Sequence, residues 1–322
     1  MIWKTDKFII AIVLAVLAAY LFPQGGSGNA KAFLDTVSSI GISFIFFFYG
    51  IKLGPEKLRL GVRNWKLHLL IQLATFLLFP LLVIGFYPIF QNESNENLWL
   101  AFLFLGAMPS TVSSSVVMVS LARGNVPAAI FNASISGLIG ILVTPLWIGL
   151  FMKNHSAGFD LGSIYVKLLT EILIPIVLGL CLQKWLGRIA LRYNQQLNTF
   201  DKSVIVLIIY KSFAESFQKK IFESVNFSDL AWITISVILL FAVVYFFTGF
   251  ISRILRFNRE DRITAQFCGT KKSLVHGTVF SKILFPATFP VGMVLLPLLV
   301  FHAIQIFIVG IIASRKSKEI NS

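Results

Sequence analysis

Two short polar segments interrupt apolar stretches of this chain, and both carry residue types that bind ions or polar solutes. A proline leaves backbone carbonyls without a hydrogen-bond donor, hydroxyl and carbonyl oxygens suit alkali cations and polar groups, and a lysine ammonium binds anions or carbonyl oxygens. The candidate binding residues of the first segment are Pro109, Ser110, Thr111, Ser113, Ser114 and Ser115. Those of the second are Lys271, Lys272 and Ser273, with Thr270 and His276 beside them.

The two segments also match each other in sequence. Six residues recur at a constant offset of 163 positions: Phe104, Gly106, Ser110, Val112, Val116 and Pro127 correspond to Phe267, Gly269, Ser273, Val275, Val279 and Pro290. Backbone groups left unpaired in hydrocarbon are so unfavourable that an interruption is tolerated only where it is buried in protein or lines a cavity. An interrupted helix in each half of a chain is typical of the central binding site of a transporter.

The lysines and the hydroxyl cluster each have an alternative explanation. A charge at the centre of a bilayer costs about 2.5–3.5 kcal/mol or more, so we expect Lys271 and Lys272 to face a polar cavity. The alternative is a span shifted along the membrane normal, with both ammonium groups reaching the headgroups. We expect the hydroxyl cluster at 110–115 to bind a ligand, whereas a single serine more often serves close helix packing.

The elements that hold these segments are expected to be membrane-spanning helices. The chain has 322 residues, of which 57% are hydrophobic and 13% charged, a composition too apolar for a soluble domain. A helix needs roughly 20 apolar residues to cross a bilayer. Ten such stretches occur, approximately at 8–22, 35–53, 66–90, 97–121, 126–152, 161–183, 201–217, 230–252, 262–282 and 290–313. The fold class is therefore an all-α integral membrane protein, and since no catalytic motif is present, the chain is not expected to be an enzyme.

The net charge of +14 is explained by orientation in the membrane. With the N-terminus inside, nineteen Lys and Arg residues fall on the inner side and five on the outer side, as expected from the excess of positive charge in cytoplasmic loops. We therefore expect both termini in the cytoplasm, a plasma (inner) membrane location, contact with anionic lipid headgroups, and no nucleic-acid partner. The alternative for the N-terminal stretch, a cleaved secretory signal, would remove the first span.

Ten spans divide into two halves of five. Because five is odd, the second half starts from the opposite side of the membrane, which makes 1–152 and 161–314 inverted repeats. Span four then corresponds to span nine, and span five to span ten. We expect the two interruptions to meet near the middle of the membrane.

Two charge pairs and two cysteines lie elsewhere in the spans. Lys167 with Glu171, and Lys211 with Glu215, have the i, i+4 spacing that brings side chains together on one helix face. We expect two ion pairs near the outer interface, with direct solute contact by Glu171 and Glu215 as the alternative. Cys181 and Cys268 have no metal-ligand spacing and are expected to be packing residues.

Several segments resemble the bile acid:sodium symporter family, in particular a divergent branch with lysines in span nine and poorly defined substrates. The resemblance is carried by 108–115, 121–126, 64–68, 72–80 and 267–274, and with ten spans it covers essentially the whole chain. It implies a core of spans three to five and eight to ten, in which interrupted spans four and nine cross, and a panel of spans one, two, six and seven. It also implies alternating access by movement of the core relative to the panel.

The resemblance further implies where sodium would bind. Family members bind two sodium ions with a Ser-Asn pair on span four, hydroxyls on span five, a Gln on span three, and a Glu followed by Gln-Asn on span nine. The matching positions here are Ser114 and Ser115, Ala129 and Ala133 with Asn132 and Ser136 nearby, Thr75 with Gln72 one turn away, and Lys271 and Lys272 without any Glu. An ammonium has no acceptor lone pair. The sodium sites are therefore expected to be degenerate. We expect the ammonium of one lysine to occupy the place of one sodium ion. Proton coupling is possible if that lysine releases its proton in one conformation.

These observations predict a secondary transporter that moves a small organic anion or another amphipathic solute. The solute and the lipid bilayer are its expected partners, and no cofactor is expected apart from sodium, which the lysines put in doubt. The alternative is a transporter-like protein that no longer transports and regulates ion homeostasis, for example of calcium, through partners. A monomer and a homodimer both remain open.

Overall fold

The computed structural model describes residues 7–26, 28–53, 64–87, 93–111, 113–152, 160–220, 227–286 and 289–318. All regular structure in these ranges is helical. Six helical stretches are long and apolar enough to cross a membrane, namely Ala30–Lys52, Trp65–Gly85, Val126–Met152, Leu161–Arg192, Ser228–Ile254 and Val291–Ser317. Phe8–Leu21 and Glu96–Ala107 are shorter apolar helices. The chain is thus an all-helical, multi-pass membrane protein.

The chain divides into two compact units. Unit 1 comprises Met1–Gly54, Asp160–Asn226 and Thr278–Leu295, and unit 2 comprises Pro55–Phe159, Phe227–Gly277 and Leu296–Ser322. Both boundaries near the C-terminus fall inside helices. The segment 278–295, which contains parts of the expected spans nine and ten, groups with unit 1.

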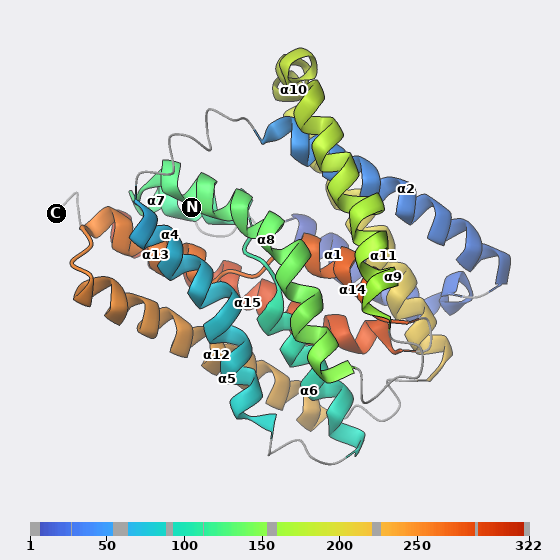
Figure 1. The fold of residues 1–322 in the computed structure, drawn as a ribbon. Helices are drawn as coiled ribbons and strands as arrows, with labels where there is room; N and C mark the ends of the chain where they lie inside the picture. The colour runs from blue at the N-terminus through green and yellow to red at the C-terminus, as the bar shows by residue number, and fades with distance from the viewer. Residues whose placement is uncertain are drawn as a thin grey trace. The chain divides into compact units, whose positions relative to one another are not determined.

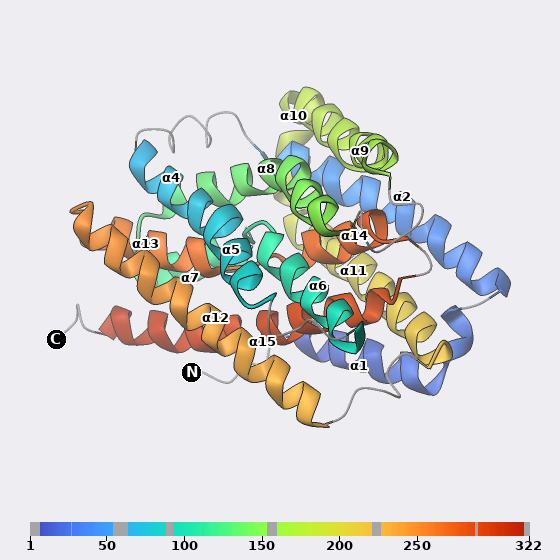
Figure 2. The same ribbon diagram turned by 60° about the horizontal axis from the view of Figure 1, so that its bottom comes forward.

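Unit 1 is built from long helices that pack along their apolar faces. Its elements are α1 (Lys7–Leu21), η1 (Pro23–Gly26), α2 (Gly28–Lys52), α9 (Leu161–Leu168), η4 (Leu169–Leu173), α10 (Ile174–Arg192) and α11 (Asn194–Gln218), with part of α14 (Leu274–Leu284) and of α15 (Val291–Lys318). Helix α1 lies beside α11 (Figure 2). Helices α2 and α10 cross so closely that a Cβ atom on Gly179 would lie 2.2 Å from the carbonyl oxygen of Phe47.

A carboxylate that lies outside the membrane-spanning stretch caps the start of helix α9. The Asp160 carboxylate accepts hydrogen bonds from the backbone N–H groups of Ser163 and Gly162, both at 3.0 Å. These backbone hydrogen bonds lower the pKa of the Asp160 carboxyl because they favour its charged form. Asp160 therefore marks the beginning of α9 in the way expected of an N-cap.

Unit 2 contains the two interrupted spans and the helices around them. Its elements are α4 (Trp65–Leu73), η2 (Ala74–Leu78), α5 (Phe79–Gly85), α6 (Glu93–Ala107), α7 (Ser113–Leu121), α8 (Val126–Met152), α12 (Phe227–Ile254) and α13 (Arg259–Thr270), with the remaining parts of α14 and α15. Helices α12 and α13 follow each other along the chain and pack together (Figures 1 and 2).

A single proline explains the irregular turn in the first rod of unit 2. Helix α4 continues through η2, a π-helical turn, into α5 as one rod (Figure 1). Pro80 has no N–H to donate to the preceding turn, so the carbonyls of Thr75 and Phe76 need other donors. The Phe76 carbonyl accepts a hydrogen bond from Trp147 Nε1 at 2.8 Å. The Thr75 carbonyl belongs to the site described below.

Three helices of unit 2 begin around one buried carboxylate, that of Asp261. Its two oxygens accept hydrogen bonds from Asn64 Nδ2 and Asn125 Nδ2, each at 2.7 Å. The side-chain oxygens of Asn64, Asn125 and Asn258 in turn cap α4, α8 and α13 by accepting backbone N–H groups. A carboxylate is favourable here because helix N-termini carry partial positive charge. We call Asp261 and these three asparagines the Asp261 cluster.

The segment 121–126 is explained by the same contacts. Helix α7 ends in a turn in which Arg123 has a φ of 55° and the N–H of Gly124 donates to the carbonyl of Val119 at 2.8 Å. A Cβ atom on Gly124 would lie 2.8 Å from Val119 and 3.0 Å from Ile263 of α13. Glycine is therefore required for the close approach of α13, and Asn125 then starts α8.

The sequence prediction of ten spans is only partly matched by helix length. The pairs α6 with α7 and α13 with α14 are each made of pieces too short to span alone, since the backbone opens between them. Helix α11 is long but is not among the six stretches that pass on length and hydropathy, because charged and polar residues occupy much of its first half. The ten-pass arrangement therefore stays a prediction.

Candidate functional site

The two interruptions expected from the sequence lie in contact. Helix α6 ends at Ala107 and α7 begins at Ser113, while α13 ends at Thr270 and α14 begins at Leu274. The N–H of Ser273 donates to the carbonyl of Pro109 at 2.8 Å, and Ser110 Oγ donates to the carbonyl of Cys268 at 2.9 Å. Of the predicted residues, the side chain of Ser113 lies outside the described part.

The ammonium of Lys272 lies in a cage of backbone carbonyls. Its Nζ donates to the carbonyl oxygens of Thr75 at 2.7 Å, Gly106 at 2.5 Å and Met108 at 3.0 Å. It also lies 4.1 Å from the centroid of the Phe79 ring, where a cation is attracted to the face of the ring. The side chain is fully buried, and each of its three N–H donors has an acceptor. We call this arrangement the Lys272 cage.

The backbone of Lys272 is held as firmly as its side chain. Gln305 of α15 accepts a hydrogen bond from the N–H of Lys272 and donates one to its carbonyl, both at 2.9 Å. Gln305 Nε2 also lies 3.0 Å from His302 Nδ1. The amide of Gln305 thus replaces the helical partners that the interrupted backbone lacks.

Two further backbone groups at the first interruption also have partners. Thr144 Oγ1 donates to the carbonyl of Ala107 at 2.7 Å, and the N–H of Ser110 donates to Ser136 Oγ at 2.9 Å. The ring of Pro109 fits against Gly140, where a Cβ atom would lie 3.0 Å from the ring. Helix α8 therefore supports the interruption with one hydroxyl group at each side and a glycine between them.

Lys271 differs sharply from its neighbour. Its side chain is fully buried, yet its Nζ has no hydrogen-bond partner. The backbone of Lys271 is extended, with φ −88° and ψ 142°, and successive side chains of an extended segment point to opposite sides. This explains why two adjacent lysines have different surroundings. Ser114 Oγ and Ser115 Oγ are also buried without a partner.

Residues predicted behind the interruption form a polar group of their own. Gln72 Nε2 donates to the carbonyl and the side-chain oxygen of Asn132, both at 3.2 Å. Asn132 Nδ2 lies 2.7 Å from His68 Nδ1 and donates to the carbonyl of Ala128 at 2.9 Å. Thr75 Oγ1 is bonded to the carbonyl of Ile71 at 2.8 Å. Thr75 thus contributes its backbone carbonyl to the site, whereas the sequence had pointed to its side chain.

The remaining predicted residues of the second interruption form local contacts. His276 Nδ1 lies 2.9 Å from Ser273 Oγ, which also accepts the N–H of His276 at 3.2 Å. Thr270 Oγ1 donates to the carbonyl of Gln266 at 2.6 Å. Thr111 is buried. The contacts of Thr270 and of Ser273 with His276 stabilise the end of α13 and the start of α14.

The Lys272 cage does not suit a sodium ion. A sodium ion needs oxygen ligands and a compensating anion, but the carbonyl oxygens of the cage are already bonded to the ammonium. The sequence stretches 65–87, 104–121, 126–152 and 262–282, which surround the cage, contain no Asp or Glu. Among the described residues, no group of three His, Cys, Asp or Glu side chains that could hold a metal ion is present.

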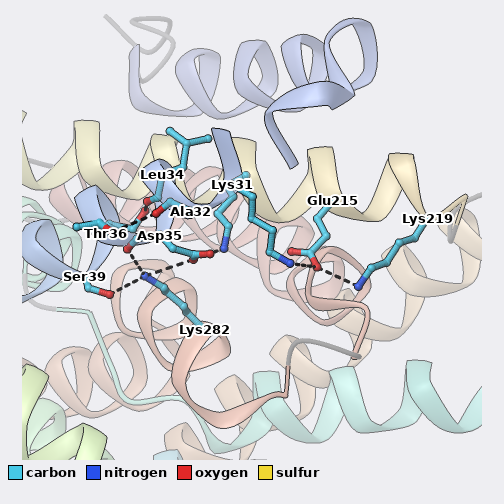
Figure 3. A network of polar contacts seen from close by, with 11 residues as sticks. Lys31, Ala32, Leu34, Asp35, Thr36, Ser39, Glu215, Lys219 and Lys282 are labelled. Atoms are coloured by element: carbon cyan, nitrogen blue, oxygen red, sulfur yellow. Dashed lines mark hydrogen bonds and ion pairs between the residues drawn. The ribbon is translucent and has the colours of Figure 1, made fainter. Parts of the chain in front are cut away.

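The two predicted i, i+4 ion pairs are wrong, and unit 1 contains a different network (Figure 3). Glu215 accepts from Lys31 at 2.8 Å and from Lys219 at 2.9 Å. Lys211 instead pairs with Asp35 of α2. Lys282 of α14 donates to the carbonyl of Asp35 and to Ser39 Oγ, both at 2.9 Å. The sequence had not identified Asp35, Lys31 or Lys282 as members of a site.

The pair Lys167 with Glu171 fails for a backbone reason. Among the described residues no ion pair joins them, because the chain changes to a π-helical turn at η4 between the two. The i, i+4 geometry holds only in a regular α-helix. Glu171 is instead close enough to Lys282 for their charges to interact.

Sequence reasoning missed several residues that hold the site. They are Gln305, His302, Thr144, His68 and the members of the Asp261 cluster. A signal was present for Gln305 and His302, which are polar residues three positions apart in an otherwise apolar stretch. The Asp261 cluster had no such signal, because its members are far apart in sequence and each of its three asparagines, taken alone, is an ordinary helix cap.

Comparison with known proteins identifies the family. A family model described as the SBF-like CPA transporter family matches residues 6–318. The protein PA2026 of Pseudomonas aeruginosa is 36% identical over 98% of this chain and 93% of its own length. The Escherichia coli K12 protein named "Putative symporter YfeH" gives the same values. The rat protein named "Sodium/bile acid cotransporter 7" is 32% identical over 95% of this chain and 90% of its own length.

These matches confirm the resemblance to the bile acid:sodium symporter family, and they place the chain among transport proteins rather than enzymes. They extend over both units and over both interrupted spans. The chain belongs to the SBF-like CPA transporter family.

Proposed function

We propose that this protein is a secondary transporter that moves a small organic anion or a related amphipathic solute by alternating access. In this proposal spans three to five and eight to ten form the core that carries the binding site, and spans one, two, six and seven form the panel relative to which the core moves. The proposal includes ten passes arranged as two inverted repeats. It also places the protein in the plasma (inner) membrane, with both termini in the cytoplasm. The contact between the two interruptions and the family membership support this reading.

The observation that carries the proposal is the Lys272 cage. Carbonyl oxygens freed at an interrupted helix form a natural site for a small cation. Here three such oxygens bind an ammonium that belongs to the chain itself. We therefore propose that Lys272 replaces one bound sodium ion. Its ammonium then satisfies the free carbonyl oxygens where the two spans cross, and no ion from solution is needed.

The symporter and cotransporter names belong to the relatives. For this chain the proposal differs from those names in one respect, because transport should not require a sodium gradient. The absence of Asp and Glu from the stretches 104–121 and 262–282 supports this difference, since a sodium ion between the two interruptions would then lack a neighbouring anion.

Uptake into proteoliposomes tests the proposed function. The purified protein is reconstituted, and accumulation of organic anions, bile salts, keto acids and steroid sulfates is compared with an inward sodium gradient and with potassium on both sides. We expect uptake of at least one anion at similar rates in both conditions, and loss of uptake in Lys272→Ala. Uptake that needs sodium, or that survives Lys272→Ala, contradicts the role of Lys272. Failure of every solute favours a regulatory protein without transport.

A further inference from the structure

We propose that Lys271, Ser114 and Ser115 form the subsite for the charged group of an organic anion. This inference rests on the proposed function and adds to it which atoms hold the anion. It places an anion in the region where the family resemblance implies a sodium ligand pair, at Ser114 and Ser115. The carboxylate, sulfonate or sulfate group of the solute is the chemistry that these donors fit.

The first argument is the distribution of unsatisfied groups. Several described polar groups at the two interruptions have partners, including all three donors of Lys272. Of the five buried side-chain nitrogen and oxygen atoms without a partner in the described residues, three are Lys271 Nζ, Ser114 Oγ and Ser115 Oγ. Buried polar groups are normally hydrogen-bonded, and an exception needs an explanation. A ligand that arrives with its own acceptors supplies one.

The second argument is position. Ser110 Oγ bonds to the carbonyl of Cys268 at 2.9 Å, which fixes the chain just before Ser114 against the chain just before Lys271. The N–H of Ser273 bonds to the carbonyl of Pro109 at 2.8 Å, which fixes the chain on the other side of Lys271. The unsatisfied donors thus belong to segments that these two hydrogen bonds hold together.

The third argument is electrostatic. Ser114 and Ser115 lie in the first turn of α7, and Lys271 precedes the first turn of α14. Helix N-termini carry partial positive charge and unpaired N–H groups, so both ends favour an anion. The stretches 104–121 and 262–282 around the two interruptions contain no Asp or Glu to neutralise Lys271. The donors present are an ammonium and two hydroxyls, and the missing component is a negative charge with several acceptor oxygens.

The two lysines therefore divide the work. All three N–H donors of Lys272 bond to backbone carbonyls and stabilise the interruption. The N–H donors of Lys271 have no partner in the chain and bind the solute. A mutation at Lys271 should affect ligand binding and relieve an unpaired buried charge. A mutation at Lys272 should damage the fold.

Thermal unfolding of the purified full-length protein tests the proposal. The probes are the potassium salts of benzoate, glycocholate and estrone sulfate at equal ionic strength, with benzamide as the uncharged match for benzoate. We expect at least one anion to raise the melting temperature of the wild type by roughly 2 °C or more, and benzamide to leave it unchanged. In Lys271→Met, the affinity for that anion should fall by at least about tenfold, as expected for loss of a charged hydrogen bond.

Two serines provide a matched pair for the same assay. Ser110 and Ser115 are both fully buried, but Ser110 Oγ has a partner and Ser115 Oγ has none. Ser115→Ala should weaken the anion response and leave the ligand-free melting temperature unchanged or higher. Ser110→Ala should lower the ligand-free melting temperature and leave the anion affinity of the folded protein nearly intact.

The outcomes that overturn the proposal are specific. The first is that none of the three anions stabilises the wild type. The second is that Lys271→Met retains the wild-type affinity. The third is that Lys271→Met lowers the ligand-free melting temperature or fails to fold. The assay needs no transport. Anion binding through Lys271 without uptake into proteoliposomes would sink the proposed function and leave this subsite standing, while anion uptake unaffected by Lys271→Met would do the reverse.

Discussion

Two adjacent lysines show how strongly a residue's role depends on the backbone around it. Lys271 and Lys272 are both fully buried, and they stand next to each other at an interruption of one span. Lys272 donates to three carbonyls, whereas Lys271 Nζ has no partner. The extended backbone at Lys271 separates the two side chains, so the pair contributes one structural cation and one free donor.

Replacement of these lysines by an apolar side chain of similar length should have opposite effects on stability. Lys272→Met leaves three buried carbonyls without a donor, and we expect a loss of about 3 kcal/mol or more. This corresponds to a fall in melting temperature of roughly 5 °C. Lys271→Met is the matched control and should leave the melting temperature unchanged or raise it. Equal losses for both variants would show that the difference in hydrogen bonding has no energetic meaning.

At this scale the sequence identified the correct residue types but not their partners. It named both lysines, and it gave no means of choosing between them, because the direction of a side chain depends on the dihedral angles of the interruption. It named Thr75 as the residue at the position of a sodium-binding side chain, whereas the backbone carbonyl of Thr75 makes the contact. Carbonyl groups are the same in every residue, so their role can be read only from the geometry.

At the scale of helices, the interruptions depend on donors supplied by neighbours. Pro80 and Pro109 remove N–H groups from their own helices, and the resulting free carbonyls are taken up by Lys272, Trp147 and Thr144. The Asp261 cluster joins the first turns of α4, α8 and α13. The cluster therefore fixes the starting points of the helices that frame the site.

Removal of the Asp261 carboxylate should loosen all three helix starts together. In Asp261→Ala, the amides of Asn64 and Asn125 lose their acceptor while partly buried, and we expect a loss of about 2–4 kcal/mol. Glu260→Ala is the control, because Glu260 is an exposed carboxylate in the same first turn. Thermal unfolding and hydrogen exchange of the first turns of α4 and α8 measure the effect. An equal, small effect of both variants would mean that Asp261 is only a helix-end charge.

Helix positions were largely predictable from apolar runs, and local distortions were not. The interruption near Pro109 could be expected because a proline cannot continue a helix, and the one near Lys271 because two charges interrupt an apolar stretch. The π-helical turn η4 had no comparable marker, and for that reason the expected pair of Lys167 with Glu171 does not form. The expected pair of Lys211 with Glu215 failed because Asp35 and Lys31, from a distant part of the sequence, are better placed.

At the scale of the whole molecule, the chain is a transporter-family protein whose two compact units divide its polar chemistry. Unit 2 contains the Lys272 cage and the Asp261 cluster, and unit 1 contains the ion-pair network around Asp35 and Glu215. The family could be recognised from the sequence because its motifs cover the interrupted spans. The solute could not, because the residues that differ from the family's sodium ligands are the ones that face it in our proposal.

The central claim is that the ammonium of Lys272 replaces a bound cation, and rescue of Lys272→Ala by free cations tests it most directly. The melting temperature of wild type and variant is measured in sodium, ammonium and choline chloride at equal ionic strength. The account predicts a wild type that responds equally to all three salts. It also predicts a destabilised variant that ammonium or sodium stabilises more than choline, because the empty cage accepts only a small cation. A wild type stabilised specifically by sodium, with a variant that no salt restores, would contradict it.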